Sequence, residues 1–111
     1  MENIVFAVRN ETEIKVIRFN SLLAITVDNY LCTFHIENED KFTCTKKLNE
    51  VEKILPEHFV KIRRNTIINS HKIKSLHLKD KKILLDGEHS FKYVAKNVKS
   101  IKLFTKFGIT I

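Results

Sequence analysis

The sequence predicts an all-β domain with one or two short helices. Its apolar residues fall in short β-branched and aromatic runs, which are typical of strands rather than of long helices. Polar turn segments such as Asn10–Glu13 and Asp86–Gly87 separate these runs. The chain holds 111 residues with only two glycines and one proline, so we expect a single folded domain of about eight to ten strands.

The first strands are expected at Ile4–Arg9 and Ile14–Arg18, paired as a hairpin around the Asn10–Glu13 turn. A near-continuous apolar run, Leu-Leu-Ala-Ile-Thr-Val, lies within Ser21–Asp28. Such a run indicates a strand that is covered on both faces.

A second hairpin is expected between Asn29 and Lys47, because apolar side chains alternate on both of its strands. Those sharing a face are Tyr30, Cys32, Phe34 and Ile36 on the first strand, and Phe42 and Cys44 on the second. A slip of one residue would turn one set to the other side of the sheet. We therefore expect Phe34 opposite Phe42 and Cys32 opposite Cys44, with a loop at 37–39 and the two thiols packed together rather than bonded.

One short helix is expected at Leu48–Leu55, where apolar residues recur at helical spacing, with Thr45 available as its N-cap and Pro56 as its end. Three further strands are expected at Ile73–Leu78, Lys81–Leu85 and His89–Val94. Val94, Val98 and Ile101 then favour a terminal helix. Residues 104–111 form either a last strand or a poorly ordered tail.

The stretch Val60–Asn69 combines a core strand with a cluster of cations. Alternation places Val60 and Ile62 on one face and Lys61 and Arg63 on the other, while Arg64 breaks the pattern at the strand's end. Asn65 and Thr66 have the character of a turn. A strand of the scaffold therefore ends, and a loop begins, at the two arginines. Binding residues are often found at such positions.

The run Leu55–Ile73 resembles the signature of the LytTR family of bacterial DNA-binding domains. The shared features are a phenylalanine, a basic doublet, a β-branched run, an asparagine and a closing isoleucine. The segments Ile25–Tyr30 and His89–Val98 add to the likeness, which covers nearly the whole chain. The resemblance implies an elongated LytTR-type fold of small antiparallel sheets, with DNA contacts on loops rather than on a recognition helix.

The resemblance also implies three positions close to DNA, namely Tyr30, Arg64 and Lys96, with Lys92 or Asn97 as alternatives to the last. LytTR domains usually end a longer regulator or membrane sensor, so this chain is either a stand-alone regulator or an isolated domain.

The charge is distributed unevenly along the chain. The formal net charge is +7, and residues 61–111 contain only three acidic side chains, Asp80, Asp86 and Glu88, against thirteen Lys and Arg. A basic half of this kind suits a polyanion. A lysine-rich solvated surface is the alternative explanation.

Arginine's forked donors can read guanine edges, whereas lysine acts on phosphates as a point charge. The candidates for base contacts are therefore Arg63 and Arg64, together with Tyr30 and Lys96 from the resemblance. The candidates for phosphate contacts are Lys61, His71, Lys72, Lys74 and Lys92. The expected function is sequence-specific binding of double-stranded DNA by a transcriptional regulator. A homodimer of this chain on DNA is an open expectation.

Two other functions stay open: a module that binds RNA or polyanions in general, and a partner-binding β domain with an incidental basic surface. RNA is disfavoured because most aromatic residues are expected to point inward, whereas single-strand readers expose them.

The sequence offers little for catalysis. We find no nucleophile elbow and no phosphate-binding glycine loop. Cys32 and His35 have the spacing of a C-x-x-H pair, but residues three apart on a strand face opposite sides, so one metal ion could not bind both. The other four histidines have no ligand spacing, and we expect no catalytic activity and no metal, cofactor or small-molecule substrate. No apolar run is long enough for a membrane span, and the N-terminus lacks signal-peptide features. We therefore expect a cytoplasmic protein that does not interact with membranes.

Overall fold

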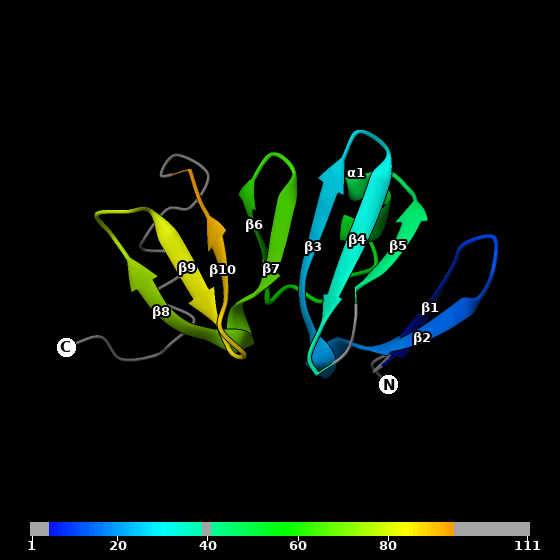
Figure 1. The fold of residues 1–111 in the computed structure, drawn as a ribbon, viewed down its shortest axis with the longest axis horizontal. Coiled ribbons are helices and arrows are strands. Elements are labelled where there is room, and N and C mark those ends of the chain that lie inside the picture. The colour runs from blue at the N-terminus through cyan, green and yellow to red at the C-terminus, as the bar shows by residue number, and fades with distance from the viewer. Residues whose placement is uncertain (1–4, 39–40, 95–111) are drawn as a thin grey trace.

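The computed structural model describes residues 5–38 and 41–94, which form ten strands, one α-helix and two 3-10 turns (Figure 1). The molecule is elongated, with extents of 46 × 34 × 25 Å. Its strands form three small antiparallel sheets, as expected from the sequence. The elements are β1 (Val5–Arg9), β2 (Ile14–Arg18), η1 (Phe19–Ser21), β3 (Leu22–Asp28), β4 (Leu31–Ile36), β5 (Phe42–Thr45), α1 (Leu48–Glu52), β6 (Phe59–Arg63), β7 (Thr66–Asn69), η2 (Ser70–Lys72), β8 (Ile73–His77), β9 (Lys82–Leu85) and β10 (His89–Lys92).

The central sheet has five strands in the order β5-β4-β3-β7-β6, and apolar residues cover both of its faces. Its middle strand, β3, contributes Leu22 and Ile25 to one core and Leu23 and Ala24 to the other. All four side chains are fully buried. The prediction of a strand covered on both faces is therefore confirmed.

The first core lies between the central sheet, the β1–β2 hairpin and α1. Phe34 is its largest fully buried side chain, and the Phe6 ring packs near it at a centroid distance of 5.8 Å. Helix α1 contributes Leu48 and Val51. The predicted β1–β2 hairpin is present, with Ala7 opposite Val16.

The second core joins the central sheet to the C-terminal sheet, whose strand order is β10-β9-β8. Ile83 and Leu85 of β9 meet Ile62 and Ile68 of the central sheet. The three-stranded sheet thus lies against the face of the central sheet that α1 leaves open (Figure 1).

The predicted cysteine register is confirmed, since Cys32 pairs with Cys44 and Phe34 with Phe42. Both cysteines are buried as free thiols. The predicted position of Tyr30 on their face is wrong, because Asn29 and Tyr30 form the β3–β4 turn and Tyr30 is 68% exposed. Asn29 takes a φ of 58°, a conformation that asparagine tolerates better than most residues, so the chain reverses before Tyr30 can join the strand.

The β6–β7 turn also differs from the prediction. It consists of Arg64 and Asn65, while Thr66 is already a buried residue of β7. A bulge lies between Lys61, which pairs with Ile67, and Arg63, which pairs with Thr66. Because the bulge adds one residue, Lys61 and Arg63 lie on opposite faces of the sheet and not on the same face.

Helix α1 is shorter than predicted, and Lys47 rather than Thr45 is its N-cap, with no side-chain cap bond. Thr45 is instead the last residue of β5, where it pairs with Leu31. The predicted terminal helix, the last segment and Lys96 lie outside the described residues.

Candidate nucleic-acid interface

Two turns that carry candidate residues lie at the same end of the central sheet, at the top of Figure 1. They are Asn29–Tyr30 between β3 and β4, and Arg64–Asn65 between β6 and β7. β3 and β7 are antiparallel neighbours with Thr26 opposite Thr66, so the end of β3 lies beside the start of β7. A hydrogen bond of 3.0 Å from the Val27 N–H to the Asn65 carbonyl ties the two hairpins together there.

The chain returns to this end after β10. The Val94 N–H donates a 3.1 Å hydrogen bond to the carbonyl of Ile62, which is next to Arg63 in β6. Val94 therefore lies beside the end of β6 that carries Arg63. Lys96 comes two residues later in the sequence, in the part of the chain that is not described.

The two arginines have different surroundings. Arg64 is exposed at the tip of its turn, whereas Arg63 is half-buried at the end of β6. Tyr30 is exposed on the neighbouring turn. The Tyr30 phenol and the Arg64 guanidinium are thus two exposed hydrogen-bonding groups on adjacent turns at one end of the sheet.

Three of the predicted phosphate contacts are already paired with carboxylates. The Nζ atom of Lys61 lies 3.7 Å from Glu52, that of Lys72 lies 3.2 Å from Glu37, and that of Lys74 lies 3.0 Å from Glu88. In contrast, no carboxylate among the described residues forms an ion pair with Arg63, Arg64 or Lys92. Among these six candidates, the three without a described carboxylate partner are therefore Arg63 and Arg64, at and directly after the end of β6, and Lys92 in β10.

His71, Lys72 and Lys74 lie toward the other end of the molecule. β7 runs away from the Arg64–Asn65 turn, so Asn69 at its end lies roughly 13 Å from Asn65 at about 3.3 Å per residue, and His71 follows in η2. The His71 ring stacks on His58 at a centroid distance of 3.9 Å. The structure thus brings together Tyr30, Arg63, Arg64 and Lys92, and places His71, Lys72 and Lys74 elsewhere.

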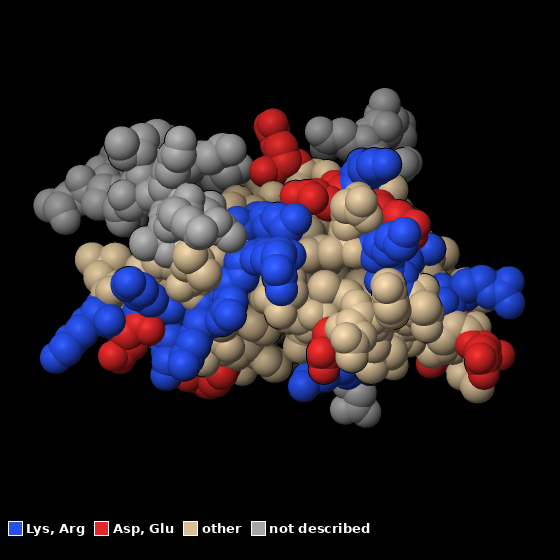
Figure 2. Space-filling model, turned by 90° about the horizontal axis from the view of Figure 1, so that it is seen from above, with Lys and Arg blue, Asp and Glu red and all other residues tan. Residues whose placement is uncertain are grey.

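Figure 2 views the molecule from the end that carries the turns. Lys and Arg side chains form a band from the middle of this face toward its lower left, and further Lys and Arg groups lie to the right with Asp and Glu between them. Sequence reasoning missed Lys82, which pairs directly with the candidate Lys92 across the β9–β10 hairpin. The Lys81–Lys82 doublet is visible in the sequence, but the doublet alone does not indicate the register that places Lys82 opposite Lys92.

In the sequence, Asn69 stands out only as the asparagine of the family signature, and the structure gives it a structural role. Its side chain is 1% exposed, donates to the Leu22 carbonyl at 2.9 Å and accepts from the His71 N–H at 3.0 Å. These bonds connect the end of β7 to the start of β3. Asn69 therefore supports the scaffold behind the turns.

Buried titratable groups lie in the sheets rather than at the exposed turns. Burial is the main cause that lowers the pKa of His35 to about 4, and its Nε2 lies 3.0 Å from the Thr26 hydroxyl. Burial likewise raises the pKa of Cys32 to about 12. Residues 5–38 and 41–94 contain no cluster of side chains suited to a metal ion, and none of their helices is long and apolar enough to cross a membrane.

Comparison with known proteins agrees with this geometry. Residues 12–106 match the family model described as the LytTr DNA-binding domain. A solved structure, the LytTr DNA-binding domain of a putative methyl-accepting/DNA response regulator from Bacillus cereus, superposes with a TM-score of 0.77 at 17% identity. The match covers 92% of this chain and 97% of that one, and it supports the fold.

Two curated relatives come from staphylococci. The sensory transduction protein LytR of Staphylococcus epidermidis is 31% identical over 91 residues, which are 80% of this chain and 36% of that protein. An uncharacterized HTH-type transcriptional regulator of Staphylococcus aureus is 30% identical over 95 residues, 83% of this chain and 64% of that protein. This chain thus spans about one third to two thirds of these relatives' lengths. With the family model matched over most of its length, the chain belongs to the LytTR family of DNA-binding domains.

Proposed function

We propose that this chain binds specific sites on double-stranded DNA and acts as a transcriptional regulator in the cytoplasm. The observation that carries the proposal is the convergence of Tyr30 and Arg64 on adjacent turns, next to cations that no described carboxylate neutralises. A Lys or Arg side chain without a carboxylate partner can bind a DNA phosphate directly and release the counterions around that phosphate. A lysine in an ion pair must first break that ion pair.

Arg64 is the proposed base reader. Its exposed turn position leaves the guanidinium free to enter the major groove, where its fork matches guanine O6 and N7. Tyr30 approaches from the neighbouring turn, and Lys96 supplies a third contact after β10. Arg63, Lys92 and Lys82 are the proposed contacts to DNA phosphates at the edge of the band.

Lys61, His71, Lys72 and Lys74 are not part of this proposed surface. Lys61, Lys72 and Lys74 are held by Glu52, Glu37 and Glu88. His71 lies at the far end of β7 and stacks on His58.

The distribution of aromatic residues supports duplex DNA over RNA. Phe19, Phe34 and Phe42 are buried, while Phe6, Phe59 and Phe91 are partly buried against the two cores. Among the described Phe and Tyr residues, Tyr30 is the only one that is exposed. One exposed ring is too few for the stacking platform of a typical single-strand RNA reader.

A second copy of the chain is the proposed partner on DNA. The outer face of the β1–β2 hairpin exposes the apolar side chains of Ile14 (65%), Val16 (62%) and Val5 (38%). Sedimentation on a bound duplex tests this, because Val16→Glu should reduce the assembly from two copies to one copy per duplex. An unchanged assembly would rule out this face as the contact.

Selection of bound duplexes from a random pool tests the main proposal. We expect an enriched sequence whose complex resists competition by single-stranded and duplex RNA in a gel shift. Equal competition by RNA would instead favour a general polyanion-binding module, and no salt-sensitive binding at all would favour a partner-binding domain.

A further inference from the structure

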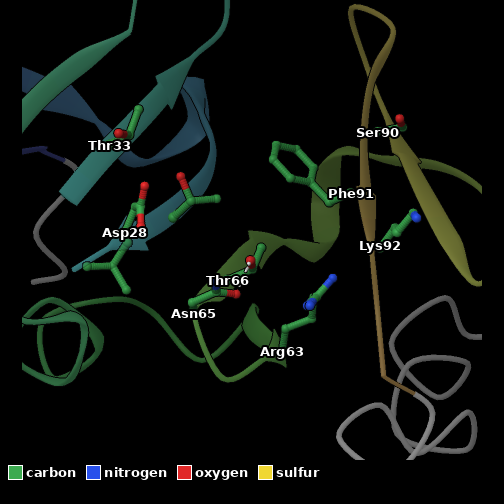
Figure 3. A pocket seen from close by; sticks show the side chains of 10 residues that line it. Asp28, Thr33, Arg63, Asn65, Thr66, Ser90, Phe91 and Lys92 are labelled. Carbon is green, nitrogen blue, oxygen red and sulfur yellow. Dashed lines mark hydrogen bonds between the residues drawn. The ribbon is translucent and has the colours of Figure 1, made fainter. Parts of the chain in front are cut away.

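A groove of about 390 Å³ lies between the central sheet and β10 (Figure 3). Its floor is the end of the central sheet near the two turns, and its wall is formed by Ser90, Phe91 and Lys92. The volume is in the range of sites for small ligands. The lining is mainly polar, so a ligand must bring hydrogen-bonding groups or charge.

The floor carries four polar side chains in one row across four adjacent strands. Thr33 pairs with Thr26, Thr26 with Thr66, and Thr66 with Arg63. The Thr26 hydroxyl is engaged with His35 Nε2 at 3.0 Å, and the Thr66 hydroxyl donates to Asn65 at 3.1 Å. The Thr33 hydroxyl and the Arg63 guanidinium make no such side-chain bond within the described part of the chain.

The side chains of Arg63 and Lys92 lie on the same side of this groove (Figure 3). Two like charges on one groove repel each other, and an anion between them removes the repulsion. The guanidinium fork also matches the oxygens of a phosphate group. This end of the groove therefore favours a phosphate.

The other end has the opposite character. Asp28 lies across the groove from Lys92, near Thr33 (Figure 3). A carboxylate accepts hydrogen bonds and repels anions, so it suits hydroxyl groups. The groove thus offers cations to one end of a ligand and acceptors to the other.

We propose that this groove binds a small sugar phosphate, with the phosphate between Arg63 and Lys92 and free hydroxyls at Asp28 and Thr33. A DNA backbone phosphate fits less well, because the sugar oxygens inside a DNA strand are esterified and have no proton to donate to Asp28. The ligand would compete with DNA for Arg63 and Lys92. Only this competition rests on the proposed function, because ligand binding itself involves no DNA.

Ribose 5-phosphate and inorganic phosphate are the probes, titrated into the folded protein and followed by amide chemical shifts. We expect saturable shifts at Thr33 and Phe91, with ribose 5-phosphate binding more tightly than phosphate. Arg63→Gln should weaken ribose 5-phosphate binding by about tenfold or more, because it removes a charge-assisted contact. Arg64→Gln is the matched control and should leave the affinity unchanged, since Arg64 does not line the groove.

Asp28→Ala separates the two ends of the ligand. It should weaken ribose 5-phosphate but not inorganic phosphate, which has no sugar hydroxyls. No saturable binding of either probe overturns the proposal, and equal affinities for both overturn the sugar assignment. If ribose 5-phosphate fails to bind while Arg63→Gln still weakens duplex binding, the cations serve DNA alone and the free ligand is refuted. Failure of wild-type protein to bind duplex would count against the proposed function only, because the probe titration uses no DNA.

Discussion

Replacing Arg64 should separate base recognition from general attraction to DNA. Arg64 is exposed at the tip of the β6–β7 turn and pairs with no described carboxylate, so its guanidinium is available to bases. We expect Arg64→Ala to cost about 1 to 3 kcal/mol on the selected duplex, or roughly 5- to 150-fold in affinity. On random duplex the loss should be much smaller, because only a phosphate attraction is removed there.

Lys61 supplies the contrast from the same strand. Its ammonium lies 3.7 Å from Glu52 on the opposite face of the sheet from Arg63, so removing it should change binding to both duplexes little. Fluorescence anisotropy at one fixed salt concentration measures both affinities for each variant. Both substitutions are at sites with some exposure, so we expect thermal midpoints within about 4 °C of wild type.

Arg64→Lys is the decisive control for this reasoning. It keeps the positive charge and removes the planar fork of donors. We expect it to bind random duplex as wild type does and to lose discrimination for the selected site. If it kept full discrimination, Arg64 would be a phosphate contact, and base reading would have to come from Arg63 or from the turn that holds Tyr30.

Three further predictions concern charge and burial. The logarithm of duplex affinity should fall with the logarithm of salt concentration with a slope of about −4 to −7, for roughly five to eight phosphate contacts. A slope shallower than about −2 would mean that the basic band is not the interface. Because burial lowers the pKa of His35 from 6.5 to about 4, the unfolded chain binds more protons between these values. Urea denaturation should thus show His35 stabilising the fold above pH 6.5, with roughly 2 kcal/mol lost between pH 7 and 4.5. His35→Gln should abolish this loss, and an unchanged pH profile would contradict it. Since burial raises the pKa of both Cys32 and Cys44, their thiols should react with an aromatic disulfide reagent about 100-fold more slowly in the folded protein than in urea. Equal rates would show that the hairpin opens readily.

Patterns of alternation predicted most of the strands, because each buried face selects its own register. The pairing of Cys32 with Cys44 follows directly from this requirement. The bulge in β6 could not be predicted in the same way, since Ile62 is apolar in either register. Its consequence is local but large, because it turns Arg63 away from Lys61 and toward the groove.

The sequence predicted the turn at the two arginines, but it did not predict which other residues lie next to that turn on the surface. The sequence indicated that Arg64 lies where a strand ends in a turn, but it placed Tyr30 on a strand and not on the exposed β3–β4 turn. The ion pairs of Lys61, Lys72 and Lys74 join residues up to 35 positions apart, as for Lys72 and Glu37. Periodicity within a strand carries no information on such partners, so the sequence alone could not tell paired cations from free ones.

Asn69 tests whether the asparagine of the family signature acts through structure. Its buried amide bonds the carbonyls of Leu22 and Phe19 at 2.9 and 3.4 Å and accepts from the His71 N–H. Asn69→Ala would leave these backbone groups without that partner, which should cost about 2 to 4 kcal/mol of folding stability. Urea denaturation measures the loss, with Asn65→Ala on the exposed turn as the matched control.

The folded fraction of Asn69→Ala should still prefer the selected duplex over random duplex, measured at low temperature where the variant is folded. The reason is that Asn69 lies at the end of β7 remote from the Arg64–Asn65 turn. A stable variant that had lost discrimination would reverse this view, because Asn69 would then act on DNA recognition and not on the scaffold. If the preference for the selected duplex is retained, the residues of the family signature have two separate roles. Residues such as Phe59 and Asn69 stabilise the β6–β7 hairpin, whereas the side chains of its turn contact DNA and can vary with the DNA site.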